Sequence, residues 1–393
     1  MSENANVIKF QSALSPKRRL VVSRLKDARI AALMNQSDLA SAVGVTRQAI
    51  SAYEQGEKSP DPETLIKIAT ILKQPISYFT SDDLPTFGEL GSLFLRAVGP
   101  ATKRRNMACA VLSKWFAQVT AYLDNLVNFP KVQIPQLAPS SSYGRYEPEE
   151  IEIAAEECRK TWQLGVGPIT NLVSLLEVHG ISVCRYEISG ETVEAFSFWD
   201  GGRPFIILSS QKDSSARSRF DAAHELGHLV LHRWIGADEL EDPKKLKEIE
   251  READRFASAF LLPRKSFPSE VFTTRLDAFV TLKRRWNVSI QAMVYRCKQL
   301  EIFDEDQVTN LYKQLSARRW RSREPLDDLR EFPLEQPRLL QKATEMVVSA
   351  GIKMADETVA DLKISQNLVA SFCNLPASFF SPADIRGFSP TIK

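Results

Sequence analysis

Residues 222–230 read Ala-Ala-His-Glu-Leu-Gly-His-Leu-Val, an H-E-x-x-H motif inside an apolar pattern of helical period. The four-residue spacing places His224 and His228 on one face of a helix, one turn apart. Two imidazoles in this position can bind one Zn²⁺, and Glu225 beside them can take a proton from water activated by the metal. The motif therefore predicts a metal-dependent hydrolase, and the function it most often serves is that of a metalloprotease.

A pair of histidines can also be no more than the polar face of a helix. The distribution of histidine in this chain favours a metal site instead. Only four histidines occur in 393 residues, and three of them fall within residues 224–232.

The third ligand is not His232. On a straight helix His224 and His232 lie about 12 Å apart along the axis, too far for two ligands that each lie about 2 Å from one zinc ion. Metzincins overcome this with a glycine turn and a later histidine, a spacing that is absent here. We expect His232 to be a helix-end residue or part of a pocket wall.

A better candidate lies in the segment IEREADRFASAFLLP, residues 249–263, whose apolar residues recur at helical spacing up to Pro263. Glu250 and Asp254 are four residues apart and share a face, whereas Glu252 points about 200° away from Glu250. The spacing favours Glu250 as the third ligand, with Asp254 orienting a ligating histidine. A solvated acidic helix face is the alternative.

Together, RSRFDAAHELGHLVLH (217–232) and IEREADRFASAFLLP resemble the ImmA/IrrE family of zinc metallopeptidases, and the similarity extends over roughly residues 150–300. The resemblance implies a gluzincin-like site with His224, His228 and Glu250 as zinc ligands and Glu225 as the catalytic base. Mn²⁺ is a conceivable substitute for zinc. Asp254 matches the family's Asp or Asn at this place. The implied substrate is a transcriptional repressor, often of the Cro/cI type, cleaved in response to stress or mobile-element signals.

A second informative region precedes this one. Residues 36–56, QSDLASAVGVTRQAISAYEQG, fit two short helices separated by a turn at Gly44, a residue that tolerates tight turns. Thr46 is a natural N-cap for the second helix. The exposed start of that helix then carries side chains suited to base edges and phosphates, namely Arg47, Gln48 and Ser51.

This region resembles the Cro/cI-type (XRE) helix-turn-helix, from Gln36 through Gly56 and on to Tyr78-Phe79. The resemblance implies that Gln36 caps the helix or contacts a backbone phosphate, and that Arg47, Gln48 and Ser51 face the major groove of double-stranded DNA. A basic cluster before and on the first helix is predicted to contact phosphates: Lys17, Arg18, Arg19, Arg24, Lys26 and Arg29. The alternatives are a plain helical bundle and a module that binds a protein partner.

Composition fits a globular protein of two or three domains, with 44% hydrophobic and 25% charged residues. The net charge of +2 excludes a polycation. We find neither an apolar run long enough for a membrane span nor a signal-peptide pattern, and the five cysteines are scattered. We therefore expect a cytoplasmic protein with reduced thiols and no membrane partner.

The predicted fold class is a multidomain α+β protein with an all-α helix-turn-helix domain, a gluzincin-like α+β metallopeptidase domain and a helical C-terminal region. The predicted boundaries are a flexible arm (1–16), the helix-turn-helix domain (17–83), a helical connector and Pro/Ser-rich linker (84–148), the peptidase domain (149–300) and the C-terminal region (301–393). Strands are expected at Ser182–Tyr186, Ala195–Phe198 and Pro204–Ser209, the metal-binding helix at 218–233, and C-terminal helices at 335–350, 355–371 and 376–386.

KQPISYFTS (73–81) is echoed weakly by NLPASFFSP (374–382), which we interpret as coincidence; a helical domain that binds a partner or senses a signal is the alternative. Two functions remain for the whole chain. One is a DNA-binding regulator with a zinc endopeptidase domain. The other is a DNA-binding regulator whose peptidase fold is a sensor or interaction module with little turnover. The oligomeric state is left open, with a homodimer as one alternative.

Overall fold

The computed structural model describes residues 19–93, 100–135, 137, 146–187, 193–236, 239, 240 and 242–381. The chain forms two compact units, Met1–Asp83 and Leu84–Lys393, which are described separately below. The predicted arm at residues 1–16 lies outside the described residues.

The described part of the first unit, residues 19–83, is all helical, as predicted. Asn35 caps the second helix through a capping box with Asp38, and Gly44 ends that helix in the left-handed conformation at a φ of 83°. Thr46 then caps the third helix, so local sequence signals set the turn. The five helices are α1 (Val22–Ala31), α2 (Gln36–Val43), α3 (Arg47–Gln55), α4 (Pro62–Ile71) and α5 (Ile76–Phe79).

A buried arginine is part of the core of this unit. Arg24 is fully buried, and its guanidinium donates to the Tyr78 carbonyl at 3.0 Å and to the Asp83 carboxylate at 3.0 Å. Arg29 is nearly buried as well and binds Glu54 at 2.6 Å. The prediction that both residues contact phosphate is therefore wrong, because both guanidinium groups form ion pairs with carboxylates inside the unit. Arg19 and Lys26 remain exposed, while Lys17 and Arg18 lie outside the described residues.

The second unit contains a three-stranded sheet and the remaining helices. Strands β1 (Ser182–Tyr186), β2 (Ala195–Asp200) and β3 (Arg203–Ser209) lie in the order β1-β3-β2, with β1 parallel and β2 antiparallel to β3. Gly201 and Gly202 connect β2 to β3, and Gly201 takes a φ of 55° there. The α+β class of this unit is thus as predicted.

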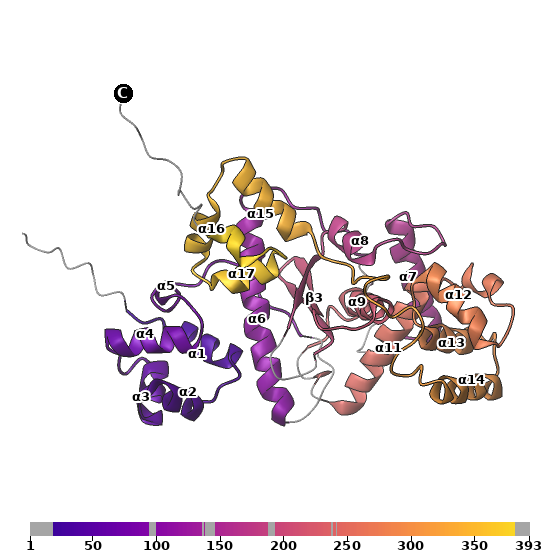
Figure 1. Ribbon diagram of the computed structural model, residues 1–393, viewed down its shortest axis with the longest axis horizontal. Coiled ribbons are helices and arrows are strands. Elements are labelled where there is room, and N and C mark those ends of the chain that lie inside the picture. Colours follow the sequence, from indigo (N-terminus) through magenta and orange to yellow (C-terminus); the bar gives the residue numbers. More distant parts are fainter. Residues whose placement is uncertain are drawn as a thin grey trace, which may run out of the picture. The chain divides into compact units, whose positions relative to one another are not determined.

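Both faces of the sheet are covered. Side chains alternate along the strands, so Val183, Ile206 and Leu208 pack into the core shared with α9 (Ser215–Leu231). On the other face the ring of Phe205 meets Phe116 of α6 (Pro100–Asp124) at 5.3 Å. Figure 1 shows the sheet, labelled at β3, between α9 and α6.

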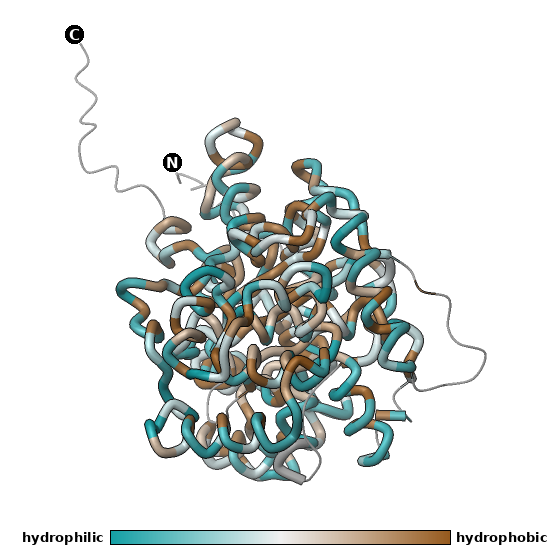
Figure 2. The backbone as a smooth tube through the Cα atoms, turned by 90° about the vertical axis from the view of Figure 1, so that its right-hand side faces the viewer, coloured by the Kyte–Doolittle hydropathy of each residue, from teal (hydrophilic) through white to brown (hydrophobic). Residues whose placement is uncertain are grey.

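Around this centre lie further helices, along which hydrophobic and hydrophilic residues alternate in Figure 2, as expected where one face meets a core. They are α7 (Pro148–Thr161), α8 (Leu172–Val178), α11 (Pro243–Leu261), η1 (Phe267–Glu270), α12 (Leu276–Trp286), α13 (Ile290–Gln299), α14 (Glu305–Ala317), α15 (Leu339–Ser349), α16 (Ala355–Leu362), α17 (Gln366–Phe372) and η2 (Ala377–Phe380).

The segment predicted as a connector packs within the second unit where it is described. Helix α6 contacts the C-terminal helices, with Phe116 and Phe372 5.2 Å apart and the Tyr122 hydroxyl 2.9 Å from Asp361. Upstream of α6, the Gly91 N–H donates to the Trp199 carbonyl at 2.7 Å, so this stretch lies along the edge of β2. Much of the Pro/Ser-rich linker predicted after α6 lies outside the described residues.

The C-terminal region is helical, but the single helix expected at 355–371 is broken. Lys363 adopts the left-handed conformation at a φ of 54°, which ends α16 before α17 begins. The two segments of the weak echo share one local structure. The Tyr78 N–H donates to the Pro75 carbonyl at 3.0 Å, and the Phe379 N–H donates to the Pro376 carbonyl at 2.9 Å. Of the helix predicted at 376–386, the structure describes the part up to residue 381, which forms the short 3-10 helix η2.

All five cysteines are buried free thiols. Among the described residues, no helix combines the length and the apolar character that crossing a lipid bilayer requires.

Replacing Arg24 with Met should destabilise the first unit by about 2–4 kcal/mol, because the buried Tyr78 carbonyl and the Asp83 carboxylate lose their donor. All six tryptophans lie beyond residue 83, so tryptophan fluorescence follows the second unit alone. In urea, the part of the helical circular dichroism signal that belongs to the first unit should melt earlier, while the fluorescence transition stays in place. Lys26→Met, on the exposed face of α1, is the control. Equal midpoints for the two variants would contradict the role of Arg24.

Candidate metal centre and nucleic-acid interface

Helix α9, which carries the H-E-x-x-H motif, crosses α11 at very short range. Gly227 makes this possible, since a Cβ there would lie 3.2 Å from both the Cα and the carbonyl oxygen of Ala253. Most of α9 is buried because it lies between the sheet and α11. The crossing brings the two histidines of α9 against the acidic residues of α11.

Three side chains converge at this crossing. The Nε2 atoms of His224 and His228 are 3.0 Å apart, and they lie 3.5 and 3.4 Å from the two carboxylate oxygens of Glu250. Ligands about 2.0–2.1 Å from a tetrahedral zinc ion are separated from one another by about 3.3 Å. The donor set of two imidazoles and one carboxylate also suits zinc. The residues therefore fit the metal that the sequence predicts.

The electrostatics of Glu250 agree with a place beside positive charge. Burial raises the pKa of its carboxyl, but hydrogen bonds and charge interactions with His224 and His228 outweigh burial and hold the pKa well below its usual range. Glu250 is therefore an anion over the whole physiological range of pH.

The outward nitrogen of each histidine also has a partner. The Nδ1 atom of His224 lies 2.8 Å from the carboxylate of Asp254, the residue predicted to orient a histidine. The Nδ1 atom of His228 lies 2.9 Å from Nδ1 of His232, whose Nε2 lies 2.9 Å from Glu252. These contacts of His232 and Glu252 were not predicted. A histidine one turn beyond the motif was the only sequence signal for them.

His232 caps the C-terminal end of α9 and is buried, so it is a helix-end residue and not part of a pocket wall. Its Nε2 lies against Glu252, whose carboxylate also accepts the Tyr146 N–H at 2.9 Å. Burial is the largest influence on the His232 imidazole and lowers its pKa to about 4. The ring is therefore neutral near neutral pH.

Glu225, the predicted base, is held by a residue that the sequence analysis missed. The hydroxyl of Ser197 on β2 donates to Oε2 of Glu225 at 2.7 Å. Both residues are almost fully buried. Ser197 lies between Phe196 and Phe198, so a small polar residue inside an aromatic strand was the available signal.

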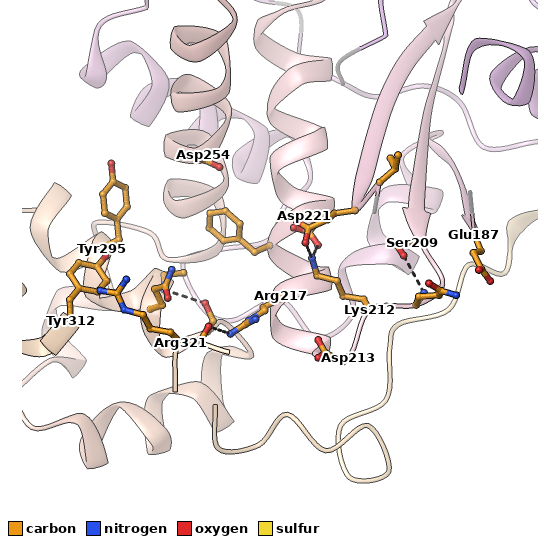
Figure 3. Close-up of a pocket in the computed structure, with 17 residues that line it drawn as sticks. Glu187, Ser209, Lys212, Asp213, Arg217, Asp221, Asp254, Tyr295, Tyr312 and Arg321 are labelled. Atoms are coloured by element: carbon orange, nitrogen blue, oxygen red, sulfur yellow. Dashed lines mark hydrogen bonds and ion pairs between the residues drawn. The ribbon is translucent and has the colours of Figure 1, made fainter. Parts of the chain in front are cut away.

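A cavity of about 670 Å³ is lined in part by Asp254, the residue that contacts the Nδ1 atom of His224. On one wall Lys212 binds both Glu194 and Asp221 at 2.9 Å. Figure 3 shows the opposite wall, with Tyr295 and Tyr312 near Arg321, whose guanidinium lies 5.6 Å from the Tyr312 ring centre. The volume of this cavity is typical of sites that hold small molecules or side chains. The cavity can therefore accept side chains of a bound peptide.

In the first unit, the predicted DNA-reading residues lie at the start of α3. Arg47 and Gln48 are exposed and Ser51 is half-buried. The hydroxyl of Thr46 accepts the Ala49 N–H at 3.2 Å as the N-cap.

The capping role considered for Gln36 is wrong, because Asn35 occupies the N-cap position of α2. The Gln36 amide instead donates to Glu54 at 2.9 Å. A contact of Gln36 with phosphate stays a prediction.

Gly227→Ala should lower both the melting temperature and the zinc affinity, although Gly→Ala in a helix usually stabilises it by about 1 kcal/mol. The added methyl group meets backbone atoms of α11, which can move away only if the crossing widens and shifts Glu250. Thermal melting and a zinc titration check this. Gly167→Ala, where the space around the new Cβ is open, should change neither quantity. A more stable Gly227→Ala protein would show that the close crossing is not required.

Two segments of the chain match known families of proteins. Residues 25–79 match the helix-turn-helix family, and residues 176–298 match the family described as the IrrE N-terminal-like domain. The chain is 37% identical over 60 residues to the cryptic phage CTXphi transcriptional repressor RstR of Vibrio cholerae (15% of this chain, 54% of the relative).

It is also 41% identical over 54 residues to the HTH-type transcriptional regulator YqaE of Bacillus subtilis (14% of this chain, 47% of the relative). A transcriptional regulator in the ATPase CF(0) region of Rhodospirillum rubrum is 39% identical over 62 residues (16% of this chain, 57% of the relative). The chain thus spans about half the length of the curated relatives it matches. It joins an XRE-type helix-turn-helix, DNA-binding segment to an IrrE N-terminal-like domain of a peptidase family.

Proposed function

We propose that this DNA-binding regulator is a zinc-dependent endopeptidase that cleaves a transcriptional repressor in response to stress or mobile-element signals. The observation that carries the proposal is the convergence of His224, His228 and Glu250. The two Nε2 atoms are 3.0 Å apart, and each lies within 3.5 Å of one carboxylate oxygen of Glu250. A carboxylate that could act as a base, Glu225, is adjacent to His224 in sequence. A scaffold without turnover has no need of this base.

When bound, zinc supplies Lewis acidity, which polarises the carbonyl of a peptide bond and makes a nearby water molecule easier to deprotonate. Glu225 accepts the proton of the attacking water on its carboxylate and delivers it to the amine of the leaving fragment. The hydrogen bond from Ser197 restrains one oxygen of that carboxylate, which keeps Glu225 oriented through both transfers. The cavity that reaches Asp254 receives side chains of the peptide.

The helix-turn-helix segment restricts this activity to substrates beside its DNA site. A repressor bound to a neighbouring operator is then presented at a high effective concentration, which raises cleavage without any new contact. A narrow substrate range follows, and it would protect other cellular proteins.

Glu225→Gln should abolish cleavage of a candidate repressor and leave zinc binding intact, because it removes the proton carrier and none of the ligands. His228→Ala should lose both. Elemental analysis for about one zinc per chain and gel electrophoresis of the repressor measure the two properties. Cleavage that survives Glu225→Gln would reject the catalytic assignment. Zinc binding without cleavage in the wild type, across repressors and operator DNA, would favour the sensor or interaction module.

Arg47→Ala should cost on the order of 1–3 kcal/mol in binding to the cognate operator and relax its sequence preference, because an arginine at the start of α3 can contact base edges. Lys26→Ala should weaken binding to all sequences alike and reduce the dependence on salt. Gel shifts over a series of salt concentrations measure both effects. Binding that is absent, or insensitive to salt, would point to a protein partner for this unit.

A further inference from the structure

The two histidines of the metal cluster are oriented by different devices. His224 relies on Asp254, whose side chain is 40% exposed. His228 relies on His232, whose side chain is 1% exposed, and through it on Glu252 at 11%. Two buried groups in series, His232 and Glu252, therefore stand behind one metal ligand, whereas a single half-exposed carboxylate serves the other.

The contacts determine where each proton lies. A histidine that binds metal through Nε2 must carry its proton on Nδ1, so His228 donates from Nδ1. The atom facing it is Nδ1 of His232 at 2.9 Å, which must then be the acceptor. His232 consequently carries its proton on Nε2 and donates it to the Glu252 carboxylate at 2.9 Å.

Glu252 is fixed in turn by the backbone. One of its oxygens accepts from His232 and the other accepts the Tyr146 N–H at 2.9 Å. The hydroxyl of Tyr146 also donates to the Leu231 carbonyl at 3.0 Å, at the end of α9. Every donor in this chain thus meets an acceptor, and each proton has one consistent position.

We propose that His232 and Glu252 are positioning residues that hold His228 in its metal-binding tautomer and thereby set the affinity for zinc. The proposal rests on the zinc centre of the proposed function. It gives a role to the third histidine of the cluster, which is too far along the helix to be a ligand. Outer partners of metal-bound histidines typically change metal affinity by about 10–100-fold.

The test is a zinc titration of the metal-free full-length protein against a chromophoric chelator. His232→Leu removes the acceptor for His228 and should raise the dissociation constant for zinc by about 10–100-fold. His232→Asn places an amide oxygen near the position of Nδ1 and should bind more tightly than His232→Leu. Glu252→Gln should also weaken zinc binding, because an amide has one oxygen for two N–H donors.

Matched controls separate positioning from folding. Glu248→Gln removes a charge from the same helix outside the cluster and should bind zinc like the wild type. Melting of each metal-free variant by circular dichroism reports the fold. If His232→Leu and Glu252→Gln fold normally and bind zinc within about twofold of the wild type, the proposal is overturned. A wild type that binds no zinc removes the proposed zinc centre itself, a different outcome.

A second measurement needs no variant. The chain has four histidines, so long-range ¹H–¹⁵N spectra of the imidazoles of the zinc-loaded protein can be assigned. We expect the proton of His228 on Nδ1 and that of His232 on Nε2. A proton on Nδ1 of His232 would contradict the proposed chain of donors even if the variants failed to fold.

Discussion

The close crossing of α9 and α11 is the constraint on which the second unit depends. Gly227 lets the two backbones meet, and the meeting brings the acidic residues of α11 against the histidines of α9. Glu250 lies between His224 and His228, Asp254 reaches the outward nitrogen of His224, and Glu252 reaches His232. Acidic residues two positions apart thus meet three different histidines. Glu252 lies on a different face of α11 from Glu250. It meets His232 there because His232 is the C-cap residue of α9, one turn beyond His228.

The sheet supports this crossing from the other side. Helix α9 covers one face of the sheet and α6 covers the other. Strand β2 lies at an edge of the sheet, and the hydroxyl of its Ser197 donates to Glu225. The hairpin end of β2 is covered by residues 89–91, whose backbone bonds to Trp199 and Gly201 satisfy groups that an open edge would expose. The stretch that follows the helix-turn-helix unit in sequence is therefore bonded to the strand that holds the base.

The first unit shows how position alone can mislead about charge. Arg24 and Arg29 belong to a basic run that suggests contact with phosphate, yet their guanidinium groups bind Asp83 and Glu54. Asp83 is 59 residues from Arg24 in the chain, so no local pattern indicates the pair. Burying a guanidinium is favourable only where acceptors surround it, and packing of α1 against the end of the unit provides them. Arg47 and Gln48, at the start of α3, are exposed instead.

Spacing along the chain determined whatever depends on a single element. The helical repeat placed His224 and His228 on one face and put Glu250 and Glu252 on different faces of their helix. Local signals predicted the turn at Gly44 and Thr46, and the ends of the three strands to within two residues. These properties follow from the repeat of a helix or strand and from local capping. The partners of Ser197, His232, Glu252 and Arg24 were decided by the tertiary structure alone. These contacts depend on where separate elements cross. The distance between two crossing helices is set by the side chains packed between them, as at Gly227, where the absence of a side chain lets α9 approach α11. The sequence of either helix alone does not show which residues of the other helix it will meet.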